Sequence, residues 1–152
     1  MFNKILLAVD GSPQSKEAAT EARELAAKLG SEVLVVHVTE MRYSGAAVWS
    51  PEPYLELDAF VEDVVDGLRS EGLEARHILV DALNGHTGKA IADLSTEEKA
   101  DLIVLGRSGH SQLPGLFLGN VATRALHYAR CSVLIAGGAD VHDRGRPEDW
   151  PS

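Results

Sequence analysis

The sequence has 152 residues, of which 45% are hydrophobic and 24% are charged, as expected for one globular domain with a sizeable core. Its formal net charge of −9 argues against a nucleic-acid partner or an anionic membrane surface, because both require a basic face. The single cysteine, Cys131, excludes an internal disulfide, and with no apolar run of membrane-spanning length it favours a cytoplasmic protein.

Five apolar runs of strand length follow one another along the chain, at residues 4–9, 32–38, 74–80, 102–105 and 132–136. Four of them are almost continuously apolar, which is typical of parallel strands covered on both faces. The run 74–80 alternates more strongly between apolar and polar residues, which indicates a strand at the edge of the sheet.

Segments with helical periodicity separate these runs. The first is expected to begin after Ser12 as the capping residue, with Pro13 in its first position, and to end at Gly30. A second covers about residues 54–70, a third follows Thr87 as a capping residue, and a fourth begins near Gly119. The side chains expected to face the core are Ala18, Ala22, Leu25, Ala26 and Leu29 in the first helix, Leu57, Val61, Val64 and Leu68 in the second, and Val121, Ala122, Ala125 and Leu126 in the fourth.

This alternation predicts an α/β fold, a doubly wound, open, parallel five-stranded sheet of Rossmann-like type with helices on both faces. Residues 1–137 are expected to form the single domain, and residues 138–152 a polar tail that is at least partly disordered. Residues 40–53 read as a long loop after the second strand, either a lid or a plain connection.

Ligands of open α/β sheets bind beyond the carboxyl ends of the strands. Asp10, Gly11 and Ser12 follow the first strand, and Gly106 and Gly109 follow the fourth. If these strands are neighbours, both loops line one crevice, where a carboxylate can bind hydroxyl groups and a glycine-rich turn can present amides to phosphates. Asp10 can equally well serve as a local cap for the first helix.

The start of the fourth helix extends this candidate site. Gly119 and Asn120 are expected at the helix N-terminus, where free amides favour an anion, and Arg107 and His110 add side-chain donors. The glycines have a simpler explanation as turns, and both interpretations remain open. The six histidines and Cys131 show no metal-ligand spacing, so no protein-bound metal site is expected.

Three blocks of the sequence, in order, resemble the universal stress protein superfamily. They are the opening "ILLAVDGSPQSKEA", the segment "ADLIVLGRSGHS" and the segment "LGNVATRALHYARCSVLIA". Gly106, Gly109 and Gly119 reproduce the family's G-x2-G-x9-G nucleotide signature. The resemblance implies a sheet order of 3-2-1-4-5, with strands numbered along the chain.

The resemblance also implies an ATP site, with Mg expected alongside the nucleotide. By position, Asp10 would hold the ribose and Ala8, Val9 and Val38 would lie near the adenine. The phosphates would be held by Gly106, Gly109, Gly119, Asn120 and Val121. Members of the family commonly dimerise through the last strand, here Ser132–Ala136, and a homodimer is therefore expected.

One position departs from the family pattern, because Asn120 stands where members carry Ser or Thr. The amide of Asn120 can cap the helix and bind a phosphate oxygen, but it lacks the hydroxyl that reaches a metal ion. The leading hypothesis is a nucleotide-responsive regulator with slow or no hydrolysis and no catalytic residues. The alternatives are a slow hydrolase or an enzyme autophosphorylated on Ser108 or Ser111, and a dimeric interaction module that needs no nucleotide.

Overall fold

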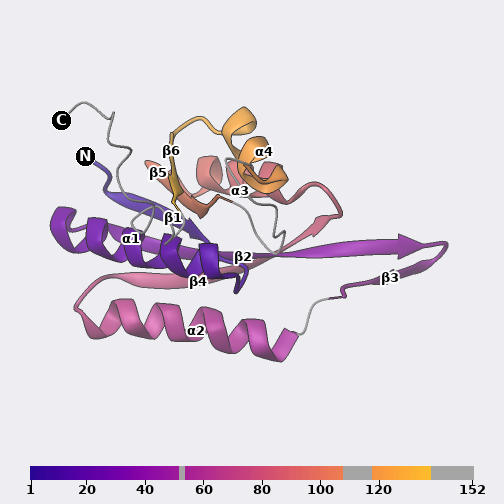
Figure 1. The fold of residues 1–152 in the computed structure, drawn as a ribbon, viewed down its shortest axis with the longest axis horizontal. Coiled ribbons are helices and arrows are strands. Elements are labelled where there is room, and N and C mark those ends of the chain that lie inside the picture. The colour runs from indigo at the N-terminus through magenta and orange to yellow at the C-terminus, as the bar shows by residue number, and fades with distance from the viewer. Residues whose placement is uncertain (52–53, 108–117, 138–152) are drawn as a thin grey trace, which may run out of the picture.

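The computed structural model of the chain describes residues 1–51, 54–107 and 118–137. Strands and helices alternate along it, with one hairpin inserted after the second strand (Figure 1). The elements in chain order are β1 Lys4–Ala8, α1 Pro13–Leu29, β2 Glu32–Ser44, β3 Ala47–Trp49, α2 Tyr54–Ser70, β4 Ala75–Leu83, α3 Thr87–Glu97, β5 Leu102–Gly106, α4 Asn120–Tyr128 and β6 Ser132–Ala136.

The five strands expected from the apolar runs form a parallel sheet in the order β4-β2-β1-β5-β6. The α/β class with a mostly parallel sheet is thus confirmed. Leu6 of β1 pairs with Leu34 of β2 on one side and with Ile103 of β5 on the other. Among the described strands β4 pairs only with β2, in line with the alternating pattern of its sequence. The carboxyl ends of β1 and β5 are therefore neighbours.

The expected five-stranded sheet is corrected by a sixth strand. β2 continues past the apolar run to Ser44, and β3 pairs antiparallel with its far end, so that Tyr43 lies opposite Val48. The two strands are joined through Gly45, whose φ of 60° is the left-handed conformation that a tight hairpin turn requires. Within the expected loop, Glu40 and Met41 thus belong to the parallel sheet, and residues 42–49 form a projecting hairpin arm (Figure 1).

Helices cover both faces of the sheet. Ile5 and Leu7 of β1 pack in one core cluster with α1 and α2, whereas Leu6 and Ala8 pack in a second cluster with α3 and α4. Successive side chains of a strand point to opposite faces, so β1 must be apolar at each of these positions. This explains why its sequence reads as an uninterrupted apolar run.

The ends of α1 follow the sequence signals. The Ser12 Oγ accepts a hydrogen bond from the Ser15 amide at 3.2 Å, and Gly30 ends the helix with a φ of 69°. Two predictions of inward-facing residues are wrong, because Leu29 is 44% exposed and Leu126 is 45% exposed. Both stand near the C-terminal ends of their helices, where the helix runs past the surface it covers.

The helices α3 and α4 cross in close contact at Gly88. A β-carbon on Gly88 would lie 2.6 Å from the Arg124 Cβ and 2.6 Å from the Val121 carbonyl oxygen. No side chain larger than hydrogen fits this crossing, so the glycine sets how closely the two helices approach. In the described part of the chain, no helix combines the length and the apolar composition needed to cross a membrane.

Candidate functional site

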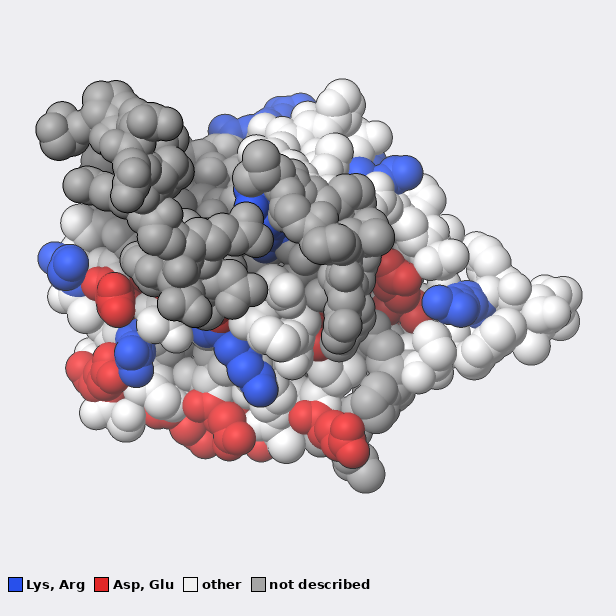
Figure 2. Space-filling view, viewed as in Figure 1, with Lys and Arg blue, Asp and Glu red and all other residues white. Residues whose placement is uncertain are grey.

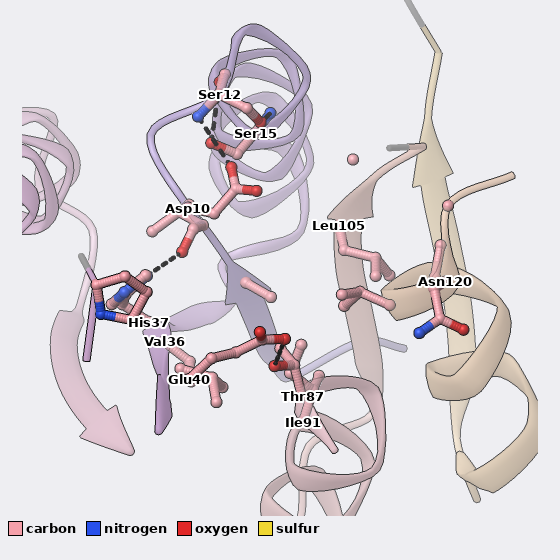
Figure 3. A pocket seen from close by; sticks show the side chains of 18 of the residues that line it. Asp10, Ser12, Ser15, Val36, His37, Glu40, Thr87, Ile91, Leu105 and Asn120 are labelled. Carbon is pink, nitrogen blue, oxygen red and sulfur yellow. Dashed lines mark hydrogen bonds between the residues drawn. The ribbon is translucent and has the colours of Figure 1, made fainter. Parts of the chain in front are cut away.

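A cavity of about 540 Å³ opens at the carboxyl ends of the central strands (Figure 3). This volume is within the range of small-molecule sites. Its walls come from the ends of β1, β2 and β5 and from the N-terminal ends of α1, α3 and α4. The lining residues are Ala8, Val9, Asp10, Ser12, Ser15, Val36, His37, Val38, Glu40, Arg42, Pro51, Thr87, Ile91, Leu105, Gly106, Gly119, Asn120, Val121 and Ala122.

The floor of the cavity is apolar because it is the α3 and α4 face of the sheet. Ala8, Val36 and Val38 belong to the core cluster on that face, together with Leu105 and Ile91. Val36 and Val38 point the same way because they are two residues apart in β2. A flat apolar ring system can lie against such a surface, with polar groups at its edges providing orientation.

Asp10 lines the cavity two residues after the end of β1. One oxygen of its carboxylate, Oδ1, accepts a hydrogen bond from the Ser12 amide at 2.9 Å (Figure 3). The Ser15 hydroxyl in turn donates to the Ser12 carbonyl at 3.0 Å. Asp10 therefore does have the local capping role that the sequence left open, because it stabilises the turn into α1. A carboxylate has two oxygens, so this bond leaves acceptor capacity for a ligand.

The N-terminus of α4 forms one end of the cavity. The first hydrogen bond of the helical ladder runs from the Thr123 amide to the Gly119 carbonyl, at 2.9 Å. The amides of Asn120, Val121 and Ala122 precede this bond and have no partner within the helix. Because these donors stand at the positive end of the helix dipole, this end favours an anion.

Asn120 does not cap α4, contrary to the prediction. The capping position is occupied by Gly119, which makes no side-chain cap, and the Asn120 Oδ1 accepts a hydrogen bond from the Arg124 Nε at 3.3 Å. The helix starts one residue earlier than a capping Asn120 would require. Asn120 is therefore the first residue of the helix, where its side chain is exposed and bonds to Arg124 one turn later.

Gly106 has a packing role that bears on the interpretation of the glycines. A β-carbon at this position would lie 2.8 Å from the Gln14 carbonyl carbon and 2.8 Å from its Cβ. The end of β5 therefore packs directly on the first turn of α1. Glycine is needed at position 11 for a different reason, since its φ of 81° is left-handed and allows the turn between Asp10 and Ser12.

The wall of the cavity between β2 and α3 holds a polar pair that the sequence did not reveal. The Thr87 hydroxyl donates a hydrogen bond to the Glu40 Oε1 at 2.9 Å (Figure 3). Thr87 thus faces β2 and makes no side-chain cap on α3, so its predicted capping role is wrong. Glu40 shares the face of Val36 and Val38, and the period-two continuation of β2 beyond residue 38 is the signal that locates it.

His37 was expected to be structural or on the surface, and the structure buries it beside the cavity. Only 4% of His37 is exposed, and its Nδ1 donates to the Val9 carbonyl oxygen at 2.8 Å. This bond joins the carboxyl ends of β1 and β2 under the cavity. Within the described ranges, no group of three or more His, Cys, Asp or Glu side chains is arranged to hold a metal ion.

The cavity brings together most of the residues singled out from the sequence. Those that line it are Ala8, Val9, Asp10, Ser12, Val38, Gly106, Gly119, Asn120 and Val121. Gly11 and Arg107 are not among the lining residues. The Arg107 carbonyl instead accepts a hydrogen bond from the Gly119 amide at 2.7 Å, which ties the end of β5 to the start of α4. Gly109, His110, Ser108 and Ser111 lie outside the described residues.

The profile of the universal stress protein family matches residues 1–137. The chain belongs to this family. A universal stress protein of Thermus aquaticus is 33% identical over 141 residues, which cover 89% of this chain and 98% of the relative. A universal stress protein of Methanocaldococcus jannaschii is 31% identical over 147 residues, covering 89% of this chain and 82% of the relative.

Solved structures of universal stress proteins share the fold. One from Archaeoglobus fulgidus superimposes with a TM-score of 0.71 at 26% identity, over 90% of this chain and all of the other. Another A. fulgidus structure, in complex with dAMP, has a TM-score of 0.65 at 24% identity and covers 90% of this chain and 98% of its own. A universal stress protein in complex with cAMP has a TM-score of 0.65 at 23% identity, and the match covers 88% of this chain and 95% of the other.

Proposed function

We propose that this universal stress protein is a cytoplasmic regulator that binds ATP in the cavity and changes its conformation or its dimer contacts in response. The observation that carries the proposal is that the α4 amides without a partner inside the helix and the Asp10 carboxylate line one cavity. The amides suit phosphate groups, and the free acceptor capacity of Asp10 suits ribose hydroxyls. The apolar face of Val36 and Val38 suits the base.

The family relatives support an adenine nucleotide as the ligand, because two of the similar structures contain cAMP and dAMP. In this proposal the phosphates lie at Gly106, Gly119, Asn120 and Val121. Gly109 and His110, from the segment outside the described residues, complete the set. In this proposal the nucleotide arrives as its Mg complex, because Mg²⁺ is readily held by phosphates and water.

The surface charge supports a small anionic ligand rather than a polyanion. Figure 2 shows acidic side chains gathered along the edge where α2 lies in Figure 1. Exposed carboxylates of α2 are Glu56, Asp58, Glu62, Asp63 and Asp66. A nucleic-acid or anionic membrane surface would be repelled by such a face. The positive potential at α4 is local, and it fits a few phosphate groups.

A homodimer through β6 is part of the proposal. Among the described strands, β6 pairs only with β5, so its outer edge offers unpaired backbone groups. Val133, Leu134 and Ile135 along this edge are only partly buried. Residues 1–137 are proposed as the nucleotide-binding domain, and residues 138–152 as an appended tail.

The proposal is of a binding protein with slow or no hydrolysis. Of the residues at the proposed phosphate end, Gly106, Gly119, Asn120 and Val121 carry neither a carboxylate nor an imidazole to orient water, which leaves His110 as the one such group in the proposed set. Asp10 has one oxygen committed to the Ser12 amide. Ser108 or Ser111 as acceptors of a phosphoryl group remain an alternative, which mass spectrometry after incubation with Mg-ATP tests directly.

Calorimetric titration with Mg-ATP tests the proposed function, using the native protein and Asn120→Asp. The substitution keeps the size of the side chain and adds a carboxylate at the first turn of α4, where acidic residues stabilise a helix. We expect the native protein to bind and Asn120→Asp to bind at least about tenfold more weakly, since like charges repel across the site.

The matched control is Asn3→Asp, the same change of charge at an exposed residue by the amino end of β1, opposite the cavity. We expect it to bind as the native protein does. Absence of saturable binding to the native protein would overturn the proposed function. Native-like binding by Asn120→Asp would show that the phosphates bind away from the N-terminus of α4.

A further inference from the structure

Glu40 and Thr87 form a hydrogen-bonded pair in the wall of the cavity that β2 and the first turn of α3 supply. Glu40 comes from β2 and Thr87 from the first turn of α3, 47 residues apart in the chain. β2 lies on one side of β1, whereas β5 lies on the other, and the Gly119 amide at the start of α4 bonds to the Arg107 carbonyl at the end of β5. A ligand that spans the cavity therefore meets the α4 amides on the β5 side and Glu40 on the β2 side.

The two ends call for opposite chemistry. Free amides at the start of α4 attract anionic oxygens, whereas the carboxylates of Asp10 and Glu40 repel them. Arg42 also lines the Glu40 end, but its side chain is exposed to solvent, where water screens its charge. Of the parts of a nucleotide, the uncharged base is thus the one that suits the Glu40 end.

The hydrogen bond from Thr87 determines what Glu40 can offer a base. The Glu40 Oε1 already accepts from the Thr87 hydroxyl, and an ionised carboxylate is an acceptor only. Glu40 is half-buried, with its carboxylate in the cavity beside Thr87 and Ile91 (Figure 3). Its remaining lone pairs call for a donor on the ligand, such as an exocyclic amino group.

We infer that Glu40, held in place by Thr87, selects purine nucleotides that carry an exocyclic 6-amino group. This inference rests on the proposed function and deepens it, because it assigns base selection to a side chain. The amino group of the base donates to the free Glu40 oxygen. A purine without this group leaves the carboxylate partly desolvated and without a partner, which is costly.

Thr87 is a positioning residue in this arrangement. Its hydroxyl holds the Glu40 carboxylate in one orientation within the cavity. Gly88, the next residue, packs α3 against α4 without a side chain, so the helix that carries Thr87 is itself firmly seated. Loss of the Thr87 hydroxyl leaves Glu40 in place as an acceptor but less well oriented.

The test is a cycle of two ligands and two proteins, measured by calorimetric titration. The ligands are Mg-ATP and the Mg complex of purine riboside triphosphate, which lacks only the 6-amino group. For the native protein we expect ATP to bind roughly tenfold to a hundredfold more tightly, as for hydrogen bonds to charged groups. In Glu40→Met, which keeps the length but removes the acceptor, the two ligands should bind about equally.

Thr87→Val provides the readout for positioning. It retains the Glu40 carboxylate, and we expect a preference for ATP that is smaller than in the native protein but larger than in Glu40→Met. The native comparison needs no substitution, so it decides the question even if a variant fails to fold. A preference for ATP that persists in Glu40→Met would overturn the inference.

Equal binding of both ligands to the native protein would also overturn the inference, while leaving the proposed function intact. Failure of the native protein to bind ATP at all would be a failure of the proposed function. The two failures are therefore distinguishable in the same titrations.

Discussion

Gly106 packs against the backbone of Gln14, with 2.8 Å between the Gln14 carbonyl carbon and the place where a β-carbon would stand. The contact joins the end of β5 to the first turn of α1 beneath the cavity. Because the neighbouring atoms include backbone, they cannot move aside as the end of a flexible side chain can. A glycine of the nucleotide signature thus has a structural requirement that is independent of any ligand.

We expect Gly106→Ala to lower the free energy of unfolding by about 1–3 kcal/mol, the usual cost of overpacking. Gly67→Ala is the matched control, because Gly67 lies in α2 with nothing within 4 Å of its added β-carbon. There alanine should stabilise the helix by about 0.5–1 kcal/mol. Urea unfolding of the two variants measures both effects. Equal stability of Gly106→Ala and the native protein would show that α1 adjusts freely.

Ser12→Ala is expected to lower the free energy of unfolding by about 1 kcal/mol, since it removes the N-cap of α1 and leaves the Ser15 amide without its acceptor. Ser70→Ala serves as the control, because the Ser70 hydroxyl is exposed at the end of α2 and bonds only to the nearby Gly67 carbonyl. Its effect should stay within about 0.5 kcal/mol. Thermal and urea unfolding would contradict the capping role if both variants changed equally.

Stability should depend on pH through Glu21. Burial, followed by repulsion from Glu17 and Glu24, raises the pKa of Glu21 above its ordinary value of 4.5. The folded state therefore holds this proton more tightly than the unfolded state, and ionised Glu21 costs stability above its raised pKa. Below pH 4.5 the group is protonated in both states, and the cost disappears.

Glu21→Gln should accordingly be more stable than the native protein at pH 7.5, with a difference that shrinks as the pH falls through the raised pKa towards 4.5. Urea unfolding of both proteins at several pH values from 4 to 7.5 measures this trend. A difference that stays constant with pH would show that the substitution acts by packing rather than by removing a charge.

Leu134→Glu is expected to weaken the proposed dimer at least about tenfold, since it sets two new carboxylates against one another at the β6 edge. Sedimentation velocity over a range of concentrations measures the change. Leu126→Glu, at a leucine of α4 that is 45% exposed, is the control and should leave the dimer unaffected. If the native protein is monomeric in the same experiment, the proposed β6 dimer is contradicted.

The parallel sheet was predictable because burial on both faces leaves a direct mark on the sequence, as in Ile5, Leu6 and Leu7 of β1. The N-cap at Ser12 was also predictable, because it depends only on residues next to one another in the sequence. The hairpin of β2 and β3 was missed because Arg42 and Tyr43 are exposed, so no buried face imposes an apolar pattern on them. Its signal is only a glycine in a short polar stretch.

The residues of the cavity also fall into those that the sequence predicts and those that it does not. Asp10, Gly106 and Gly119 were predictable because a parallel sheet brings the carboxyl ends of neighbouring strands to one edge. Glu40 and Thr87 were not, since their contact depends on how far β2 extends and on where α3 crosses it. Asn120 was placed correctly at the start of α4, but its bond to Arg124 follows from a helix start that no residue type specifies.

The contact of Gly88 with α4 limits how this binding site can evolve. Of the atoms that crowd position 88, the Val121 carbonyl oxygen and the Ala125 amide nitrogen belong to the backbone, so no exchange of side chains on α4 can make room there. Any mutation that enlarges residue 88 has to displace the N-terminus of α4 itself. Descendants of this sequence can therefore alter the proposed base end through Glu40 or Thr87 while the proposed anion end at α4 is inherited unchanged, as long as residue 88 remains glycine.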